Sequence, residues 1–253
     1  MKFKQNIPWY KNNYLKKNWL IEESTHYTFY FFRNSLAEKN INKIIRTKEK
    51  HYEKILSFLN VKNYQKINYY LYPSLRIKQK LIGDDSFGNV IWQEFELVKN
   101  KVRTKLFEVH VLYNSDIKFI GEHEDTHLLS LPWGLSIYLF NEGLAQFLEG
   151  SLLGKDINFL SKKFMEENKF YHLEWLVDCK NWDKVEPKIV YSQAGSFVGY
   201  LINSYGLERF KKPYEALSRK KKIKENIRII EKSYSKSIDQ IEKDWKSYLA
   251  ERF

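Results

Sequence analysis

Residues 121–147 read GEHEDTHLLSLPWGLSIYLFNEGLAQF, and the rest of the chain is best interpreted from this stretch. His123 and His127 are four residues apart, and Glu124 directly follows the first histidine. Residues four apart on a helix differ by about 40° in azimuth and about 6 Å along the axis, so both imidazoles can reach one ion. This H-E-x-x-H pattern is typical of a zinc-binding helix with the glutamate as general base. The alternative interpretation is a surface helix with two exposed histidines.

A catalytic zinc site needs a third protein ligand and an open position for water. Glu142 is the candidate, because it lies on a largely apolar segment expected to be helical, where an unpaired carboxylate would be costly. Residues 132–134 (Pro-Trp-Gly) are expected to form the turn that brings this helix back to the histidines. The alternative is that Glu142 faces solvent.

Composition excludes several classes of protein. The chain has 253 residues, 43% of them hydrophobic, with 10 Gly and 5 Pro, which excludes a disordered or collagen-like protein. Its single cysteine, Cys179, excludes an intramolecular disulfide framework. The sequence contains no run of 18 apolar residues, so we expect no membrane-spanning helix. The amino-terminal stretch lacks the apolar core of a signal peptide, so we expect a cytoplasmic protein if Met1 is the native start.

The net charge of +12 raises the question of acidic partners. Lysine is abundant along the whole chain, which favours a general compositional bias, and we expect no nucleic-acid partner. A basic nucleic-acid or membrane-surface binder stays open as a less favoured alternative. Its candidate residues are Lys211, Lys212 and the run 219–224.

The pattern of elements predicts one compact α+β domain, 1–253, with two lobes. Residues 1–118 are expected to form a helical lead-in and a small mixed sheet, and 119–253 a helical lobe that carries the H-E-x-x-H helix. A capping box at Ser35 and Glu38 supports helix in the lead-in. The expected strands are 66–72, 90–98 and 105–113, and the expected later helices are 118–130, 136–152, 156–167, 191–205, 208–217 and 236–252.

Three segments together resemble the gluzincin (H-E-x-x-H…E) zinc metallopeptidases of the peptidase-MA-like superfamily. They are the motif at 123–127, the Asn-Glu-Gly-x-Ala segment at 141–145, and the segment 191–201, which Tyr191 opens. The resemblance implies a zincin-like fold, one catalytic Zn²⁺ and peptide or protein substrates. It also implies that His123, His127 and Glu142 hold the metal, and that Glu124 and Tyr191 are catalytic.

The chain departs from the better-known branches of this family. Only residues 128–141 separate His127 from Glu142, and the G-x-M-E-N segment of the aminopeptidase branch is absent; GDDSFGN at 83–89 occupies its region. The pattern is therefore closer to short peptidase-MA-like proteins of unknown substrate. A catalytically silent zinc-binding domain with a regulatory role is the main alternative. Residues 90–98 are expected to be the sheet edge that binds an extended peptide.

Overall fold

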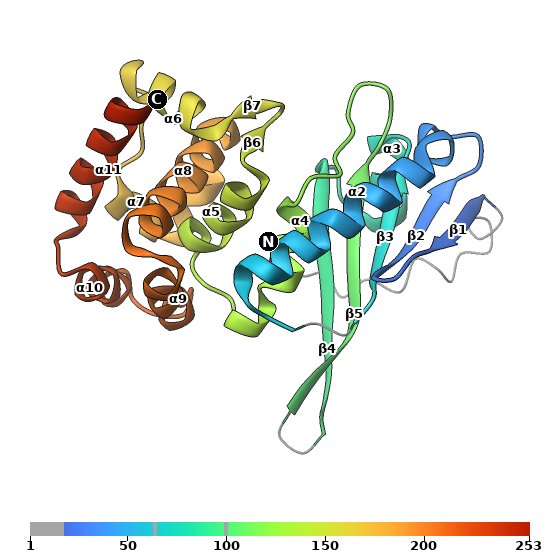
Figure 1. The fold of residues 1–253 in the computed structure, drawn as a ribbon, viewed down its shortest axis with the longest axis horizontal. Coiled ribbons are helices and arrows are strands. Elements are labelled where there is room, and N and C mark those ends of the chain that lie inside the picture. The colour runs from blue at the N-terminus through green and yellow to red at the C-terminus, as the bar shows by residue number, and fades with distance from the viewer. Residues whose placement is uncertain (1–17, 63–64, 99–100) are drawn as a thin grey trace. The chain divides into compact units, whose positions relative to one another are not determined.

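The computed structural model describes residues 18–62, 65–98 and 101–253. The chain divides into two compact units, Met1–Leu128 and Leu129–Phe253. The division falls inside helix α4 (His123–Leu129), whereas the sequence interpretation placed the lobe boundary before this helix. Both units are drawn in Figure 1.

The first unit contains a mixed five-stranded sheet in the order β1-β2-β3-β5-β4. The central pairs β2–β3 and β3–β5 are parallel, and the outer pairs β1–β2 and β4–β5 are antiparallel. The strands are β1 (Trp19–Glu23), β2 (Tyr27–Phe32), β3 (Ile67–Tyr72), β4 (Gly88–Val98) and β5 (Lys101–Leu112). The predicted mixed sheet and its three predicted strands are confirmed, and β4 lies at an edge.

The predicted helical lead-in is wrong for residues 19–32, which form β1 and β2. Tyr27, Phe29 and Phe31 of β2 are all buried, because β2 lies inside the sheet between β1 and β3. Aromatic residues favour a half-buried pleated surface, so this aromatic run packs better as a strand than as a helix.

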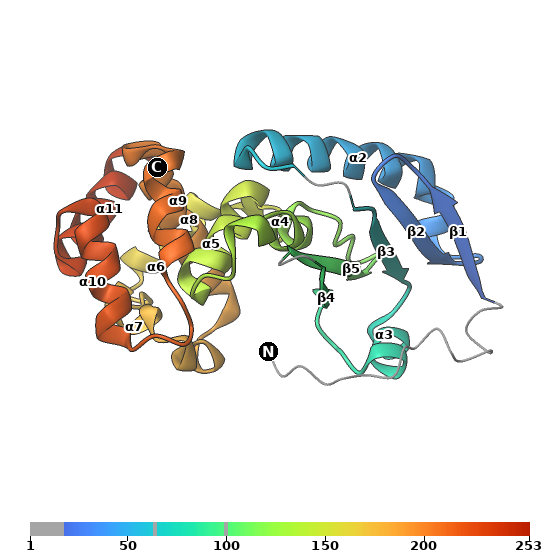
Figure 2. The same ribbon diagram turned by 90° about the horizontal axis from the view of Figure 1, so that it is seen from below.

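Helix α2 (Leu36–Leu59) covers one face of the sheet, and α3 (Leu75–Ile82) lies on the other side (Figure 2). The Ser35 side chain accepts a hydrogen bond from the Glu38 backbone N–H, which confirms the predicted amino-terminal cap. One apolar face of α2, with Ile44, Tyr52 and Ile55, is buried in the core. The same packing fully buries the side chain of Lys48.

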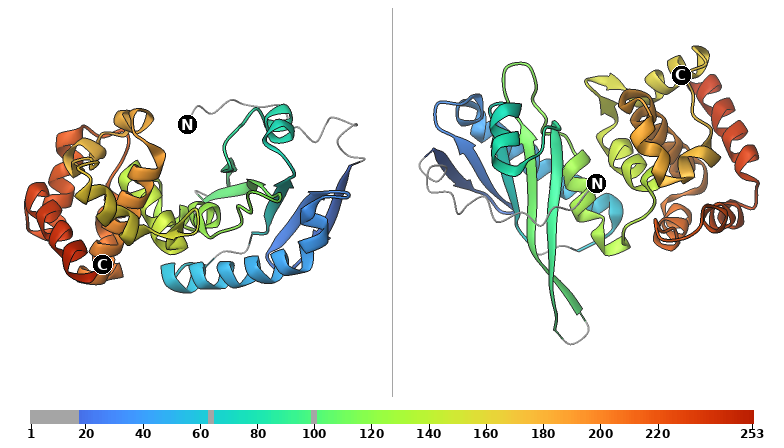
Figure 3. Two further views of the ribbon diagram at one scale, coloured as in Figure 1. Left: turned by 90° about the horizontal axis from the view of Figure 1, so that it is seen from above. Right: turned by 180° about the vertical axis from the view of Figure 1, so that it is seen from behind.

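The second unit is helical, as Figure 3 shows from two further directions. Its helices are α5 (Tyr138–Glu149), α6 (Ile157–Glu166), α7 (Leu173–Val177), α8 (Pro187–Tyr205), α9 (Leu207–Ala216), α10 (Ile223–Tyr234) and α11 (Ile238–Arg252), with short 3₁₀ turns η2 (Leu131–Trp133) and η3 (Cys179–Lys184) and a small β6–β7 hairpin (Ser151–Leu152, Lys155–Asp156). Helix α8 is buried along most of its length and contacts α5, α6, α9 and α11. It forms the centre of this unit.

Most predicted helices of this half are confirmed within a few residues, including the end of α8 at Gly206, which has φ 84°. Helix α4 begins at His123, later than predicted, and the sequence interpretation missed α3, α7 and α10. Among the described residues, the structure contains no helix with both the length and the apolar character needed to cross a bilayer.

Candidate metal centre

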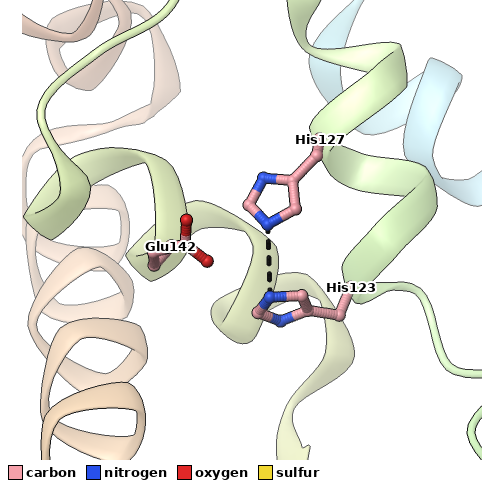
Figure 4. Close-up of side chains that lie close together, drawn as sticks. All are labelled: His123, His127 and Glu142. Atoms are coloured by element: carbon pink, nitrogen blue, oxygen red, sulfur yellow. Dashed lines mark hydrogen bonds between the residues drawn. The ribbon is translucent and has the colours of Figure 1, made fainter. Parts of the chain in front are cut away.

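The predicted ligands come together in the structure. His123 and His127 project from α4 toward Glu142 of α5, which follows after the 3₁₀ turn η2 (Figure 4). One ligand atom from each of the three residues lies within 4.8 Å of the other two. This is the one group of three or more potential metal-binding side chains within the described part of the chain.

The geometry of the two histidines fits a shared ion. Their Nε2 atoms lie 3.2 Å apart, and the two rings are nearly perpendicular, at 85°. Two nitrogens bound at 2.0–2.1 Å to one tetrahedral zinc ion would lie about 3.3 Å apart. His123 is buried, whereas His127 and Glu142 are half-buried. Two imidazoles and a carboxylate form a donor set that suits Zn²⁺.

Helix α4 is short, and buried contacts with α2 and β2 hold it in place. Asp125 points into the core, where its Oδ2 lies 2.7 Å from Lys48 Nζ and accepts a hydrogen bond from the Tyr27 hydroxyl at 2.8 Å. The Lys48 and Asp125 side chains are both fully buried. Burial raises the pKa of the Asp125 carboxyl, and Lys48 and Tyr27 oppose that shift. The charged pair therefore fixes the face of α4 opposite the histidines.

The chain entering α4 is held by the same lysine. Lys48 Nζ donates to the carbonyl oxygen of Gly121 at 2.8 Å and also lies 3.4 Å from that of Ile120. Next to them, Glu122 accepts from Lys54 Nζ at 2.8 Å. One helix of the first unit thus contacts the entry segment and the first turn of α4.

Glu142 is supported within the second unit by a chain of hydrogen bonds from two uncharged side chains. The Tyr214 hydroxyl donates to Asn141 Oδ1 at 3.0 Å, and Asn141 Nδ2 lies 3.4 Å from Glu142 Oε1. Burial raises the pKa of Tyr214 to about 12, so its hydroxyl remains a donor at neutral pH. This chain of contacts orients the Glu142 carboxylate from the side of α9.

Five polar residues near the motif or Glu142 in the sequence could accept a hydrogen bond from the second ring nitrogen of a metal-bound histidine: Asp116, Glu122, Asp125, Asn141 and Glu149. Asn141 contacts Glu142, as described above, whereas Asp125 is turned into the core and Glu122 pairs with Lys54. Asp116 is exposed and accepts a hydrogen bond from the Ser115 hydroxyl within its own loop. Glu149 lies at the end of α5 and is half-buried.

Glu124, the predicted general base, lies on the same helix and is buried. Its Oε1 atom packs against Gly88, the first residue of the edge strand β4: a Cβ on Gly88 would approach it to 2.5 Å. The candidate base thus lies beside the first residue of β4, two residues before the stretch 90–98 that was predicted to bind an extended peptide.

Tyr191 lies in the first half of α8, half-buried, with its ring against Trp182. Helices α5 and α8 approach closely at Gly143, where a Cβ would lie 2.7 Å from the Ala194 carbonyl oxygen. Tyr191 precedes Ala194 by one helical turn, so it is near the row that faces α5. Its role at an oxyanion stays a prediction.

Lys48, Tyr214 and Gly88 were not singled out from the sequence. Lys48 carries one signal, since it stands in line with the apolar positions Ile44, Tyr52 and Ile55 of an amphipathic helix. Tyr214 and Gly88 carry no comparable signal, because their roles depend on contacts between distant segments.

Compared with known proteins, the chain matches no family model and no curated protein.

Proposed function

We propose that this protein is a zinc-dependent peptidase with a zincin-like arrangement of its sheet and motif helix. The observation that carries the proposal is the convergence of His123, His127 and Glu142 ligand atoms within 4.8 Å of one another. Chance H-E-x-x-H matches on surface helices do not require a third ligand on a separate helix. Here the third ligand is the one that the resemblance to gluzincins named.

The residues divide the work as follows. His123, His127 and Glu142 would hold the ion, which would supply Lewis-acid polarisation of a carbonyl and activation of water near neutral pH. Glu124 accepts a proton from the attacking water and passes it to the leaving amine. Tyr191 donates a hydrogen bond to the developing oxyanion.

The edge strand β4 supports a peptide as the substrate. An edge strand presents unpaired backbone N–H and C=O groups, to which an extended peptide can add as a further strand. Gly88 at the start of β4 contacts Glu124, so a peptide paired with this strand would run past the candidate base.

The first test is metal content, measured by elemental mass spectrometry on the purified protein and four variants. We expect near-stoichiometric zinc in the wild type and in Glu124→Gln, and its loss in His123→Ala, His127→Ala and Glu142→Ala. Zinc binding that is indifferent to Glu142 would contradict the three-ligand site.

The second test is turnover of a peptide library by the zinc-loaded protein. We expect cleavage by the wild type and a loss of about 10²–10⁴-fold in Glu124→Gln, the usual contribution of a general base. Zinc binding without any cleavage would favour the alternative, a catalytically silent zinc-binding domain.

A further inference from the structure

The contact between Gly88 and Glu124 has a steric origin. A Cβ on Gly88 would lie 2.4 Å from Phe119 Cε1 and 2.5 Å from Glu124 Oε1. Both distances are well below van der Waals contact. Gly88 is not among the glycines with positive φ, so its backbone conformation is open to any residue. Glycine is therefore favoured at position 88 because a side chain there would overlap with Glu124 and Phe119.

The position of Gly88 is in turn fixed by a buried lysine. Lys78 of α3 is fully buried, and its Nζ donates to Asp84 Oδ1 at 2.8 Å and to the Ser86 carbonyl oxygen at 2.7 Å. Ser86 Oγ lies 2.8 Å from the Gly88 carbonyl oxygen. These contacts tie the GDDSFGN loop to α3 immediately before β4 begins.

The other side of the same loop is attached to the sheet. The Phe87 carbonyl oxygen accepts a hydrogen bond from the Leu112 N–H at 2.8 Å, next to the first β4–β5 pair, Gly88 with Val111. Gly88 is therefore held from α3 and from β5 at once. The Glu124 side chain, which packs against Gly88, therefore has a fixed surface on that side.

Electrostatics link Lys78 to Glu124 as well. Burial lowers the pKa of the Lys78 ammonium; Asp84 opposes this shift most strongly, followed by Glu124 and then Asp85. Glu124 is thus among the carboxylates whose charge acts on the buried ammonium.

We propose that Lys78, Ser86 and Gly88 are positioning residues for Glu124: the lysine-held loop fixes a bare backbone surface at Gly88, against which the Glu124 carboxylate is oriented. The catalytic meaning of this arrangement rests on the proposed function, whereas the orientation itself does not. None of the three residues is itself a predicted metal ligand.

The test observes the Glu124 carboxylate directly. The full chain is labelled with [5-¹³C]glutamate, and the Glu124 signal is identified as the one missing from Glu124→Gln. Spectra of the zinc-loaded and zinc-free protein are recorded at one pH for Gly88→Ala, Ser86→Ala and Lys78→Met. Lys80→Met is the matched control, because Lys80 is an exposed lysine on the same helix.

We expect the Glu124 signal to shift or broaden in Gly88→Ala and Lys78→Met, to move less in Ser86→Ala, and to stay unchanged in Lys80→Met. Zinc content should stay at the wild-type level in all four. With a cleavable peptide, kcat of Gly88→Ala should fall about 100-fold, the usual cost of misplacing a reacting group by about 1 Å.

An unchanged Glu124 signal in Gly88→Ala overturns the proposal, whatever the activity. If Lys78→Met fails to fold, Gly88→Ala and the exposed Ser86→Ala still decide the question. A shifted signal in a protein that cleaves no peptide would leave the positioning intact and count against the peptidase function alone.

Discussion

Helix α4 and helix α5 each present metal-ligand candidates, but their surroundings differ in kind. Helix α4 is held by a fully buried ion pair between Lys48 and Asp125. Helix α5 is held near Glu142 by the hydrogen bond between the uncharged Tyr214 and Asn141 side chains, by the contact of Asn141 with Glu142, and by its close approach to α8. A buried charge is costly when its partner is removed, whereas a neutral hydrogen bond has a modest net effect. The two regions should therefore respond to mutation very differently.

The largest effect is expected from Lys48→Met. This change leaves the Asp125 carboxylate buried without its cation and should lower the free energy of unfolding by about 3–5 kcal/mol. Urea unfolding followed by circular dichroism measures the loss, with Lys50→Met, an exposed position of the same helix, as the control. The double variant Lys48→Met/Asp125→Leu should recover much of the loss. Equal stability of Lys48→Met and the control would contradict the comparison.

Acid should weaken the charged region. The pKa of His51 is lowered to about 4, mainly by burial and then by Lys48, from an ordinary value near 6.5. The unfolded chain therefore binds a proton at a higher pH than the folded chain, so stability falls as the pH drops from about 6.5 to about 4.

The expected contribution of His51 over this range is about 1–3 kcal/mol. His51→Gln should flatten the pH dependence of the urea midpoint between these values. An identical slope in the variant would show that other groups carry the acid sensitivity.

On the side of α5, Asn141→Ala should act on the metal more than on the fold. Removing a residue that orients a ligand typically costs 10–100-fold in metal affinity. Competition with a chromophoric zinc chelator measures the affinity, and thermal unfolding of the zinc-free protein checks the fold. Asn203→Ala, at an exposed position of α8, is a suitable control.

The smallest effect is expected from Tyr214→Phe, which removes one buried hydroxyl and keeps the ring. The loss in unfolding free energy should be about 0.5–1.5 kcal/mol, with a small decrease in zinc affinity. A loss as large as that of Lys48→Met would erase the distinction between the two regions.

The sequence predicted the parts of this structure that depend on local periodicity. The strands at 66–72, 90–98 and 105–113 and the helix that carries Glu142 have clear patterns of their own, and the three ligand candidates followed from spacing and chemistry. The sequence missed strands β1 and β2, because the capping signal at Ser35 predicts only the helix α2 that follows it and carries no information on the residues before it.

The supports of the candidate site were beyond the reach of the sequence for a different reason. Lys78 lies on a short helix that was not predicted, and it hydrogen-bonds to the loop 83–89, which the sequence marked only as the region of the absent G-x-M-E-N segment. The Tyr214–Asn141 contact joins residues 73 positions apart, and neither segment has a sequence pattern that predicts contact with the other. Such contacts depend on tertiary packing.

The long reach of the Asp125 contacts has a consequence for how the protein folds. Asp125 bonds Tyr27, 98 positions earlier, so α4 acquires its buried partners only when α2 and the sheet have come together. Contacts between such distant positions form slowly, because a long loop must close first. The two histidines would then reach their geometry among the last events of folding. In refolding experiments, zinc uptake should lag behind the recovery of the sheet. The metal would then bind and stabilise a chain that is already largely folded.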